Sequence, residues 1–282
     1  MIKTLTEPLA DQFFGEGWVS FPQDPDIAAW ARAVLPVAEG CIADPQHRAD
    51  WLRSGGTWFV GAGVLPNDGR GALPRHEVPP LAGRPIRFIT EVLGFTGFDW
   101  DRGQVSACFP GYPRRDQQES EAAFRFRRDR DAAHLDGLMR LDGRRRRLSE
   151  YHGFIFGLPL TDHAQEAAPF TIWEGSHEII RRAFRERLAN VPPERWAAED
   201  VTDAYIAARR EVFETCRRVA IHAKPGSAYL VHRLAIHGVA PWPAEDERAA
   251  VTKSEAAAAR IIAYFRPDPF PDSSPEWWLE HP

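Results

Sequence analysis

The fold of this chain is indicated most strongly by residues 224–238, KPGSAYLVHRLAIHG. The pair Pro225-Gly226 is a turn signal, and the apolar run 227–231 (SAYLV) directly after it favours a β-strand. His237 stands just past the end of this strand, beside Gly238. A strand bounded by a turn in this way favours a β-rich architecture.

Similar short segments occur on both sides of this stretch. We expect strands at 18–21, 57–64, 104–109, 124–127, 151–160, 170–173 and 260–265, and helices at 5–14, 26–37, 85–93 and 201–219. Many short strands with turn signals and a few helices predict a mainly β protein with helical supports, a barrel or jelly roll. We expect a single domain over residues 1–282, with an N-terminal helical support at about 1–100 and a barrel core at about 101–270.

Composition limits the possible functions. The chain has 282 residues, 44% of them hydrophobic, and a net charge of -5, which is ordinary for a globular protein and excludes intrinsic disorder. The acidic balance argues against a nucleic-acid partner. No apolar run approaches the roughly 18 residues of a membrane span, and the start MIKTLTEPLADQFF lacks an apolar leader. The three cysteines are far apart and form no disulfide framework. A cytoplasmic protein without a membrane partner is therefore expected.

The segment AHLDG, residues 133–137, carries the clearest chemical signal. On a strand, residues two apart point to the same face, so His134 and Asp136 can reach one ion together. A further histidine would complete a group of two histidines and one carboxylate. Such a group holds three positions of an octahedral Fe(II) and leaves three open. Alone, the pattern also fits a histidine and an aspartate in a hydrogen-bonded turn.

Two histidines compete for the third place, His232 and His237. They have opposite parity in an extended strand, so both are not expected to face one metal. His237 is favoured because it precedes a glycine-containing turn. An exposed turn histidine without a ligand role is the alternative interpretation.

Arg260 opens the segment RIIAYFRP, which has the pattern of a buried strand. An anionic cosubstrate inside a barrel needs a buried cation, and arginine can hold a carboxylate with two parallel hydrogen bonds. A half-exposed arginine at the start of a strand is the alternative.

The order of these elements resembles the phytanoyl-CoA dioxygenase-like family of Fe(II)/2-oxoglutarate-dependent oxygenases. The segments that carry the resemblance are LTEPLADQFFGEGWVSFP (5–22), AHLDG (133–137), YHGFIFGLPLTD (151–162), FTIWEGSHE (170–178) and KPGSAYLVHRLAIHG (224–238). In the fourth of them Glu174 stands where the family usually has a proline. The resemblance covers nearly the whole chain and implies a double-stranded β-helix, a jelly roll of the cupin-like kind.

The resemblance also implies a site and a reaction. His134, Asp136 and His237 would ligate Fe(II), 2-oxoglutarate would chelate the metal and place its far carboxylate on Arg260, and O2 would take the last position. The implied activity is hydroxylation of a small organic substrate, with 2-oxoglutarate decarboxylated to succinate and CO2. Related halogenases have a small residue in place of the aspartate, so Asp136 argues against halogenation.

The sequence departs from the family at the arginine. The family's arginine usually follows the distal histidine more closely, and that spacing falls on Arg248. We prefer Arg260, because it starts a well-patterned strand whereas the segment around Arg248 is polar and reads as a loop.

Two other functions remain open. A cupin-like metal barrel could perform redox-neutral isomerase or lyase chemistry without 2-oxoglutarate, and Arg260 would then face solvent. A non-catalytic ligand-binding barrel would bind no metal. The sequence predicts neither the identity of the substrate nor the oligomeric state.

Overall fold

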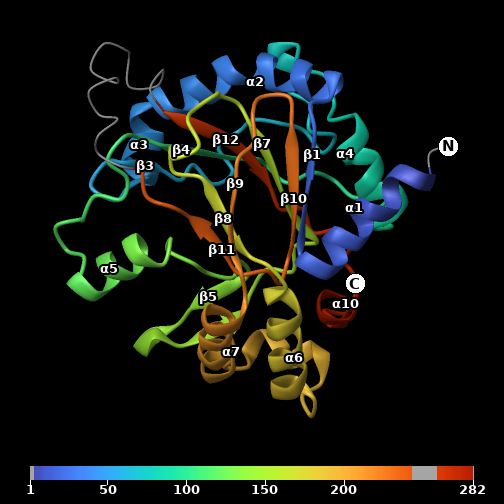
Figure 1. Ribbon diagram of the computed structural model, residues 1–282, viewed down its shortest axis with the longest axis vertical. Helices are drawn as coiled ribbons and strands as arrows, with labels where there is room; N and C mark the ends of the chain where they lie inside the picture. The colour runs from blue at the N-terminus through green and yellow to red at the C-terminus, as the bar shows by residue number, and fades with distance from the viewer. Residues whose placement is uncertain (1–2, 243–258, 282) are drawn as a thin grey trace.

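A computed structural model describes residues 3–242 and 259–281 (Figure 1). Its largest element is an antiparallel sheet of seven strands in the order β1-β10-β7-β12-β4-β3-β2. The strands are β1 (Trp18–Phe21), β10 (Ala228–His232), β7 (Phe154–Pro159), β12 (Arg260–Phe265), β4 (Gln104–Cys108), β3 (Trp58–Phe59) and β2 (Leu52–Arg53). The predicted strands at 18–21 and 260–265 are confirmed at both ends.

A smaller antiparallel sheet has the order β11-β8-β9, with β11 at His237–Val239, β8 at Phe170–Trp173 and β9 at Arg218–Ile221. An isolated bridge joins His134 to His237 at the outer edge of β11. A separate hairpin follows the bridged segment and consists of β5 (Leu138–Arg140) and β6 (Arg146–Leu148).

The two sheets share one apolar cluster. Side chains of β12 alternate, so Ile262 and Tyr264 pack with Phe170 and Ile172 of the small sheet. The intervening β12 side chains belong to a different cluster, on the opposite face of the large sheet, together with α2 (Pro25–Ala43). Both faces of β12 are therefore buried, which explains its nearly continuous apolar sequence.

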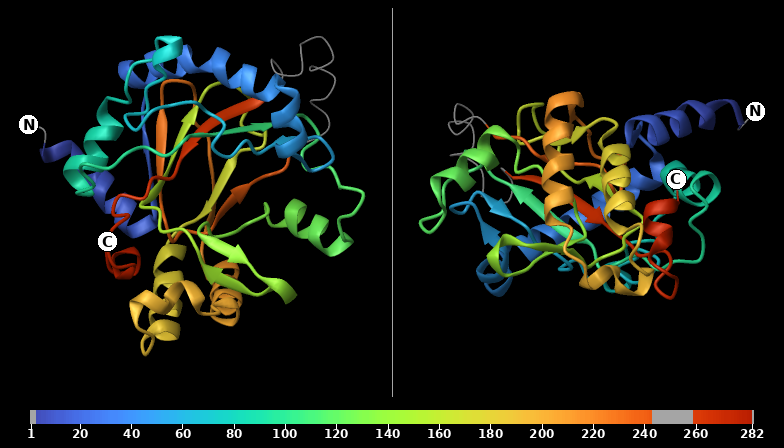
Figure 2. Two further views of the ribbon diagram at one scale, coloured as in Figure 1. Left: turned by 180° about the vertical axis from the view of Figure 1, so that it is seen from behind. Right: turned by 90° about the horizontal axis from the view of Figure 1, so that it is seen from below.

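Helices cover the outside of the sheets. Figure 1 shows α2, which packs on one face of the large sheet, along the top of the view, with α6 (Ser176–Leu188) and α7 (Thr202–Thr215) together at the bottom; Figure 2 shows the same arrangement from behind. Among the described residues, no helix is both long and apolar enough to cross a membrane. The remaining described helices are α1 (Lys3–Glu16), α3 (Pro45–Trp51), η1 (Pro74–His76), α4 (Arg84–Arg87), η2 (Phe88–Val92), α5 (Glu121–Asp129), η3 (Asp142–Arg144), η4 (Pro193–Ala198) and α10 (Glu276–Glu280).

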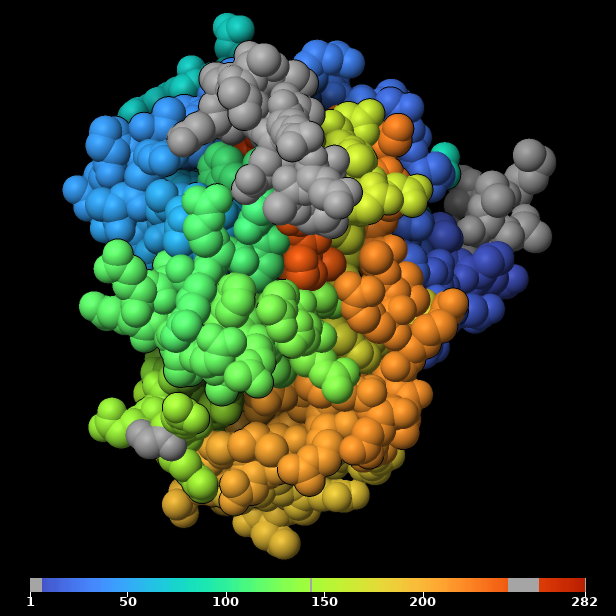
Figure 3. Space-filling model, turned by 60° about the vertical axis from the view of Figure 1, so that its left-hand side comes forward, coloured from blue at the N-terminus to red at the C-terminus, as the bar shows by residue number. Residues whose placement is uncertain are grey.

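The predicted strand at 124–127 is wrong, because these residues lie in α5. The Ser120 side chain accepts a hydrogen bond from the Ala123 amide and caps the helix, and Glu121 pairs with Arg125 one turn later. These local interactions favour a helix where the alternation of Phe and Arg suggested a strand. Figure 3 shows the green segment around α5 at the surface, above the gold and orange residues of α6 and α7.

Two further differences concern the segments around the small sheet. The predicted helix 201–219 ends at Thr215 in α7, and residues 218–221 form β9, which pairs with β8. Helix α6 was not expected, although its buried Ile180, Phe184 and Leu188 follow one another at helical spacing. In both places the pairing or packing partner lies far away in the sequence.

Three histidines are buried outside the bridged segment: His152, His177 and His232. Burial lowers the pKa of each, and that of His152 falls to about 3. Both ring nitrogens of His152 lack a hydrogen-bond partner within the part of the chain that the structure describes. Protonation of these rings would place a positive charge in a region with little water to solvate it, which is unfavourable.

These buried histidines make the metal-free protein sensitive to acid. Between the unperturbed value of 6.5 and about 3, the unfolded chain binds a proton at His152 that the folded chain does not. Stability is therefore lost as pH falls, by about 2 kcal/mol between pH 6.5 and 5 for one such histidine. Urea unfolding in EDTA at pH 6.5 and at pH 5 measures this effect. The free energy of unfolding should fall less for His152→Leu than for the wild type.

Wild type must be compared with His152→Leu because Asp101 changes the stability of both proteins with pH in the opposite direction. Burial raises the pKa of Asp101 to about 6, so its protonation stabilises the folded state below that pH. Asp101 is present in both proteins, so its contribution cancels when the stability change of His152→Leu is subtracted from that of the wild type. Equal pH dependence in the two proteins would contradict the assignment to His152.

Candidate metal centre

The structure brings His134, Asp136 and His237 together, as the sequence predicts. Nε2 of His134 lies 3.1 Å from Oδ1 of Asp136, and Nε2 of His237 lies 3.6 Å from Oδ2. One ligand atom from each residue lies within 4.8 Å of the others, and no other group of three such residues occurs in the described ranges. Ligands about 2.1 Å from one octahedral ion lie about 3 Å apart along an edge, so these spacings suit a single ion.

The backbone places the two histidines side by side. The His134 amide donates to the His237 carbonyl at 2.8 Å, and the His237 amide donates to the His134 carbonyl at 3.1 Å. The two ring centroids are 4.6 Å apart, and the Phe170 ring stacks on His237 at an interplanar angle of 9°. His134 thus reaches the site through one bridged residue, and Asp136 begins the turn that follows.

Both histidine rings present the same nitrogen to the aspartate. Nδ1 of His134 lies 3.0 Å from the Ala132 carbonyl oxygen, and Nδ1 of His237 lies 3.0 Å from the Ala235 carbonyl oxygen. A carbonyl only accepts, so Nδ1 carries the proton in each neutral ring. Nε2 then has a free lone pair directed to the space beside Asp136, the arrangement seen in metal-ligating histidines.

Two glycines allow the ligand segments to approach other backbone. A Cβ at Gly238 would overlap the Asp131 carbonyl oxygen, which accepts a hydrogen bond from the Val239 amide at 2.9 Å. Gly137 has a φ of +83°, and a Cβ there would lie 2.5 Å from the Glu150 carbonyl oxygen. The glycines next to Asp136 and His237 are therefore required by close packing of the main chain.

Gly238→Ala is expected to destabilise the protein by about 1–3 kcal/mol, as overpacking in a filled site does. The added methyl group displaces the segment at Asp131 and separates His134 from His237, so metal affinity should fall as well. Urea unfolding and Mn(II) titration measure the two effects. Gly40→Ala, where a Cβ meets nothing within 4 Å in helix α2, is the matched control. Wild-type behaviour of Gly238→Ala would refute the packing argument.

Arg266, which contacts Asp136 directly, was not predicted from the sequence. Its Nη1 donates to Oδ2 of Asp136 at 2.9 Å. Burial alone would raise the pKa of the Asp136 carboxyl, but Arg266, together with His237 and His134, holds it well below its usual range. The spacing contained a signal, since Arg266 is six residues after Arg260 and, one residue past the end of β12, continues the alternation that begins at Arg260.

A cavity of about 140 Å³ opens beside the three residues. The His134 side chain is 47% exposed at this site, whereas that of His237 is only 5% exposed, so solvent reaches the centre from the His134 side. The cavity is mostly apolar and aromatic, with a few polar groups close to Asp136. Its other lining residues are Trp58, Val60, Gln104, Ser106, Ile155, Phe170, Gly238, Val239, Tyr264 and Arg266.

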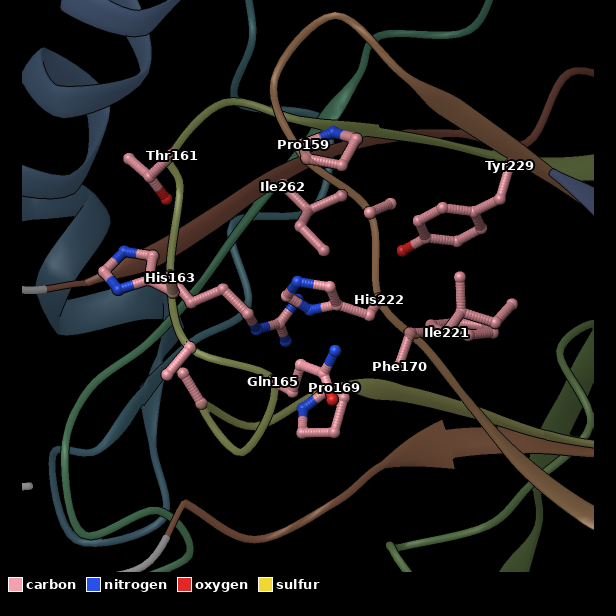
Figure 4. Close-up of a pocket in the computed structure, with 14 residues that line it drawn as sticks. Pro159, Thr161, His163, Gln165, Pro169, Phe170, Ile221, His222, Tyr229 and Ile262 are labelled. Carbon is pink, nitrogen blue, oxygen red and sulfur yellow. The ribbon is translucent and has the colours of Figure 1, made fainter. Parts of the chain in front are cut away.

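Arg260 is buried at the other end of β12, with 7% exposure. Its Nη2 lies 3.5 Å from Sγ of Cys108, whereas Nε and Nη1 have no partner among the residues that the structure describes. Arg260 lines a separate cavity of about 20 Å³, shown in Figure 4, and Phe170 borders both cavities. The alternative anchor, Arg248, lies outside the described residues.

Two tyrosine hydroxyls stand beside Arg260. The Tyr229 hydroxyl donates to the Tyr264 hydroxyl at 2.8 Å, and Tyr264 also lines the larger cavity. Burial raises the pKa of Tyr264, so its hydroxyl stays protonated and can itself donate. The two tyrosine hydroxyls therefore lie between Arg260 and the cavity that the three candidate ligands line.

His232, the rival of His237 in the sequence analysis, is not part of the group. Its Nε2 lies 2.9 Å from Nη2 of Arg181, and its ring is 4.8 Å from that of His177. His232 is fully buried in this cluster, so a structural role accounts for it.

Several solved structures align with this chain over most of its length. AviO1 from Streptomyces viridochromogenes Tue57 aligns over 95% of this chain and 97% of its own, with 14% identity and a TM-score of 0.50. SnoN, a non-heme alpha ketoglutarate dependent epimerase from nogalamycin biosynthesis, aligns over 94% of this chain and 84% of its own, with 13% identity and a TM-score of 0.46. EctD from S. alaskensis, solved with bound Fe, aligns over 92% of this chain and 74% of its own, with 17% identity and a TM-score of 0.42.

No family model matches the chain, and no curated protein sequence matches it either. The likeness to AviO1 extends over nearly the full length of both chains and shows a shared fold. At this level of identity it carries no information about activity. The resemblance to the phytanoyl-CoA dioxygenase-like family therefore stays a prediction.

Proposed function

We propose that this protein is a non-haem Fe(II)/2-oxoglutarate-dependent dioxygenase that hydroxylates a small organic substrate. The observation that carries the proposal is the group of His134, Asp136 and His237, with both histidine Nε2 atoms directed toward the carboxylate. The proposal includes a double-stranded β-helix of the cupin-like kind as a single domain, membership in the phytanoyl-CoA dioxygenase-like family, and a cytoplasmic location.

The three residues fit Fe(II). Two imidazoles and one carboxylate on one side of an ion are the ligand set of non-haem iron oxygenases, and they leave three positions open. The open positions would face the 140 Å³ cavity, where a cosubstrate and a substrate could be accommodated. Fe(II) bound there would supply oxidation by O2, coupled to decarboxylation of 2-oxoglutarate to succinate and CO2.

Arg260 fits the far carboxylate of 2-oxoglutarate. Nε and Nη1 of the buried Arg260 guanidinium have no hydrogen-bond partner among the described residues. An anion that accepted from them would be favourable, because each hydrogen bond left unmade by a buried group costs about 1–3 kcal/mol, and more for a charged group. The Tyr264 hydroxyl can donate to the same carboxylate. Arg260 and Tyr264 would bind and orient the cosubstrate, since they would act on its non-reacting end.

The apolar walls of the cavity have a separate role. Phe170 stacks on His237 and restrains its ring, while Trp58, Ile155 and Val239 make the cavity wall apolar. A substrate that covered the exposed His134 side would exclude water, which would protect a reactive oxidant and favour contact with a C–H bond. The cavity suits a small organic molecule as substrate.

The burial of Arg260 bears on the redox-neutral alternative. A barrel that works without 2-oxoglutarate would leave this arginine free to face solvent, but its exposure is only 7%. The observation therefore favours the oxygenase over the isomerase or lyase.

Anaerobic addition of 2-oxoglutarate to the Fe(II)-loaded protein tests the proposal. Chelation of iron by the 2-oxo acid should produce a weak visible charge-transfer band, and O2 should then release succinate. Zn(II)-loaded protein is the control, because a d¹⁰ ion cannot give this band. A protein that binds Fe(II) but shows no band would refute the oxygenase and support the redox-neutral barrel. A protein that binds neither Fe(II) nor Mn(II) would support the non-catalytic alternative.

A further inference from the structure

Arg266 directly follows β12, which ends at Phe265. Arg260, Ile262 and Tyr264 alternate along one face of the strand, and Arg266 continues their spacing one residue past its end, so the two arginines lie at opposite ends of one row of side chains. Arg266 is at the end beside the candidate metal ligands, and its side chain is 28% exposed. Its amide donates to Oδ1 of Asp101 at 2.8 Å, which fixes the main chain just after the strand ends.

The guanidinium of Arg266 is held on two sides. Nη1 donates to Oδ2 of Asp136 at 2.9 Å, and Nη2 donates to Oε1 of Gln104 at 2.9 Å. Gln104 is the first residue of β4 and pairs with Tyr264 across the large sheet, so its position is set by the sheet. Gln104 therefore fixes the orientation of the Arg266 guanidinium, and with it the direction of the hydrogen bond to Asp136.

This arrangement distinguishes the two oxygens of Asp136. Oδ2 accepts from Arg266, whereas Oδ1 lies 3.1 Å from Nε2 of His134. Oδ2 also lies 3.6 Å from Nε2 of His237, but one of its two lone pairs accepts the hydrogen bond from Arg266. An ion between the ligands would therefore find both lone pairs of Oδ1 available but only one of Oδ2, which favours binding through Oδ1.

We propose that Arg266 is a positioning residue that keeps Asp136 a one-oxygen metal ligand. The inference rests on the proposed function and deepens it. An octahedral ion held by His134, His237 and one oxygen of Asp136 has three open positions, two for a chelating 2-oxo acid and one for O2. If both carboxylate oxygens bound the ion, one of these positions would be lost.

A different role for the ion pair predicts the opposite result. If Arg266 only neutralises Asp136 in the metal-free protein, it competes with the metal, and its removal should tighten metal binding. If it positions Asp136, its removal should weaken metal binding by about 10–100-fold, as loss of a hydrogen-bond partner of a ligand usually does.

Titration with Co(II) separates these outcomes, using calorimetry for affinity and visible absorption for coordination number. Wild type, Arg266→Gln and Arg266→Lys are compared, and thermal unfolding confirms that each variant is folded. We expect about 10–100-fold weaker binding for Arg266→Gln, partial recovery for Arg266→Lys, and an altered absorption spectrum. Arg218→Gln is the matched control, because Arg218 pairs with Asp131 in the same region but Asp131 is outside the ligand group.

Unchanged or tighter Co(II) binding by Arg266→Gln, with the wild-type spectrum, would overturn the inference while leaving the proposed function intact. Equal weakening in Arg218→Gln would overturn it as well, because the effect would then be general to the region. A wild-type protein that binds no Co(II) would overturn the proposed function and this inference together.

Discussion

His237→Ala is expected to abolish succinate release and to weaken Mn(II) binding by well over 100-fold. Loss of a mere hydrogen-bond partner of a ligand already costs about 10–100-fold, so loss of a ligand should cost more. The His237 side chain is buried and contacts Phe170, so its truncation also leaves a small cavity. Metal titration by electron paramagnetic resonance measures the affinity, and 2-oxoglutarate turnover measures the activity.

The matched comparison for this variant is His232→Asn. His232 was the competing ligand by sequence, and it lies in the cluster with Arg181 and His177. His232→Asn is expected to lose stability but to bind Mn(II) as the wild type does once folded. Retained metal binding in His237→Ala, or its loss in a folded His232→Asn protein, would show that the ligand set is wrong.

Arg260→Gln is expected to weaken 2-oxoglutarate binding while leaving Fe(II) binding unchanged. Removal of one partner from a buried, hydrogen-bonded charge pair costs about 2–5 kcal/mol, which corresponds to at least about a 30-fold higher dissociation constant. The charge-transfer band should therefore require much more 2-oxoglutarate to reach the same intensity. Its position should not change, because Arg260 is not among the metal ligands.

Two variants show whether the effect belongs to Arg260 alone. Cys108→Ala removes the sulfur that contacts Nη2 but leaves the guanidinium in place, so near-normal 2-oxoglutarate binding is expected. Arg248→Gln tests the alternative anchor. If Arg248→Gln weakens 2-oxoglutarate binding and Arg260→Gln does not, the cosubstrate site must be assigned to Arg248.

Local pattern was sufficient to predict several elements that position the site. Strand β12 could be located to the residue, because its run of six residues is too short for a typical buried helix and is rich in β-branched and aromatic side chains. His134 and Asp136 could be identified as a pair of candidate metal ligands, because residues that are two apart on an extended segment point to the same face. The prediction of a strand around His134 was only partly right, since the structure has a single bridged residue there and a turn at Asp136.

Other features depend on contacts that local sequence does not contain. Helix α5 forms through its cap and a side-chain pair, although its Phe and Arg residues alternate as in a strand. The role of Arg266 becomes visible only when Asp136, 130 residues earlier in the chain, lies beside it. A buried guanidinium at Arg260 likewise cannot be distinguished from an exposed one by sequence, because burial is decided by the sheets around it.

The bridge between His134 and His237 also has a consequence for association between chains. Strand β11 is an outer strand of the small sheet, and outer strands with free N–H and C=O groups can pair with a second chain. Here the segment from Asp131 to His134 covers that side through three backbone hydrogen bonds. An ion bound by both histidines would join this segment to β11 through side chains as well as through the backbone. The metal centre would then protect the protein against edge-to-edge aggregation, in addition to its part in chemistry.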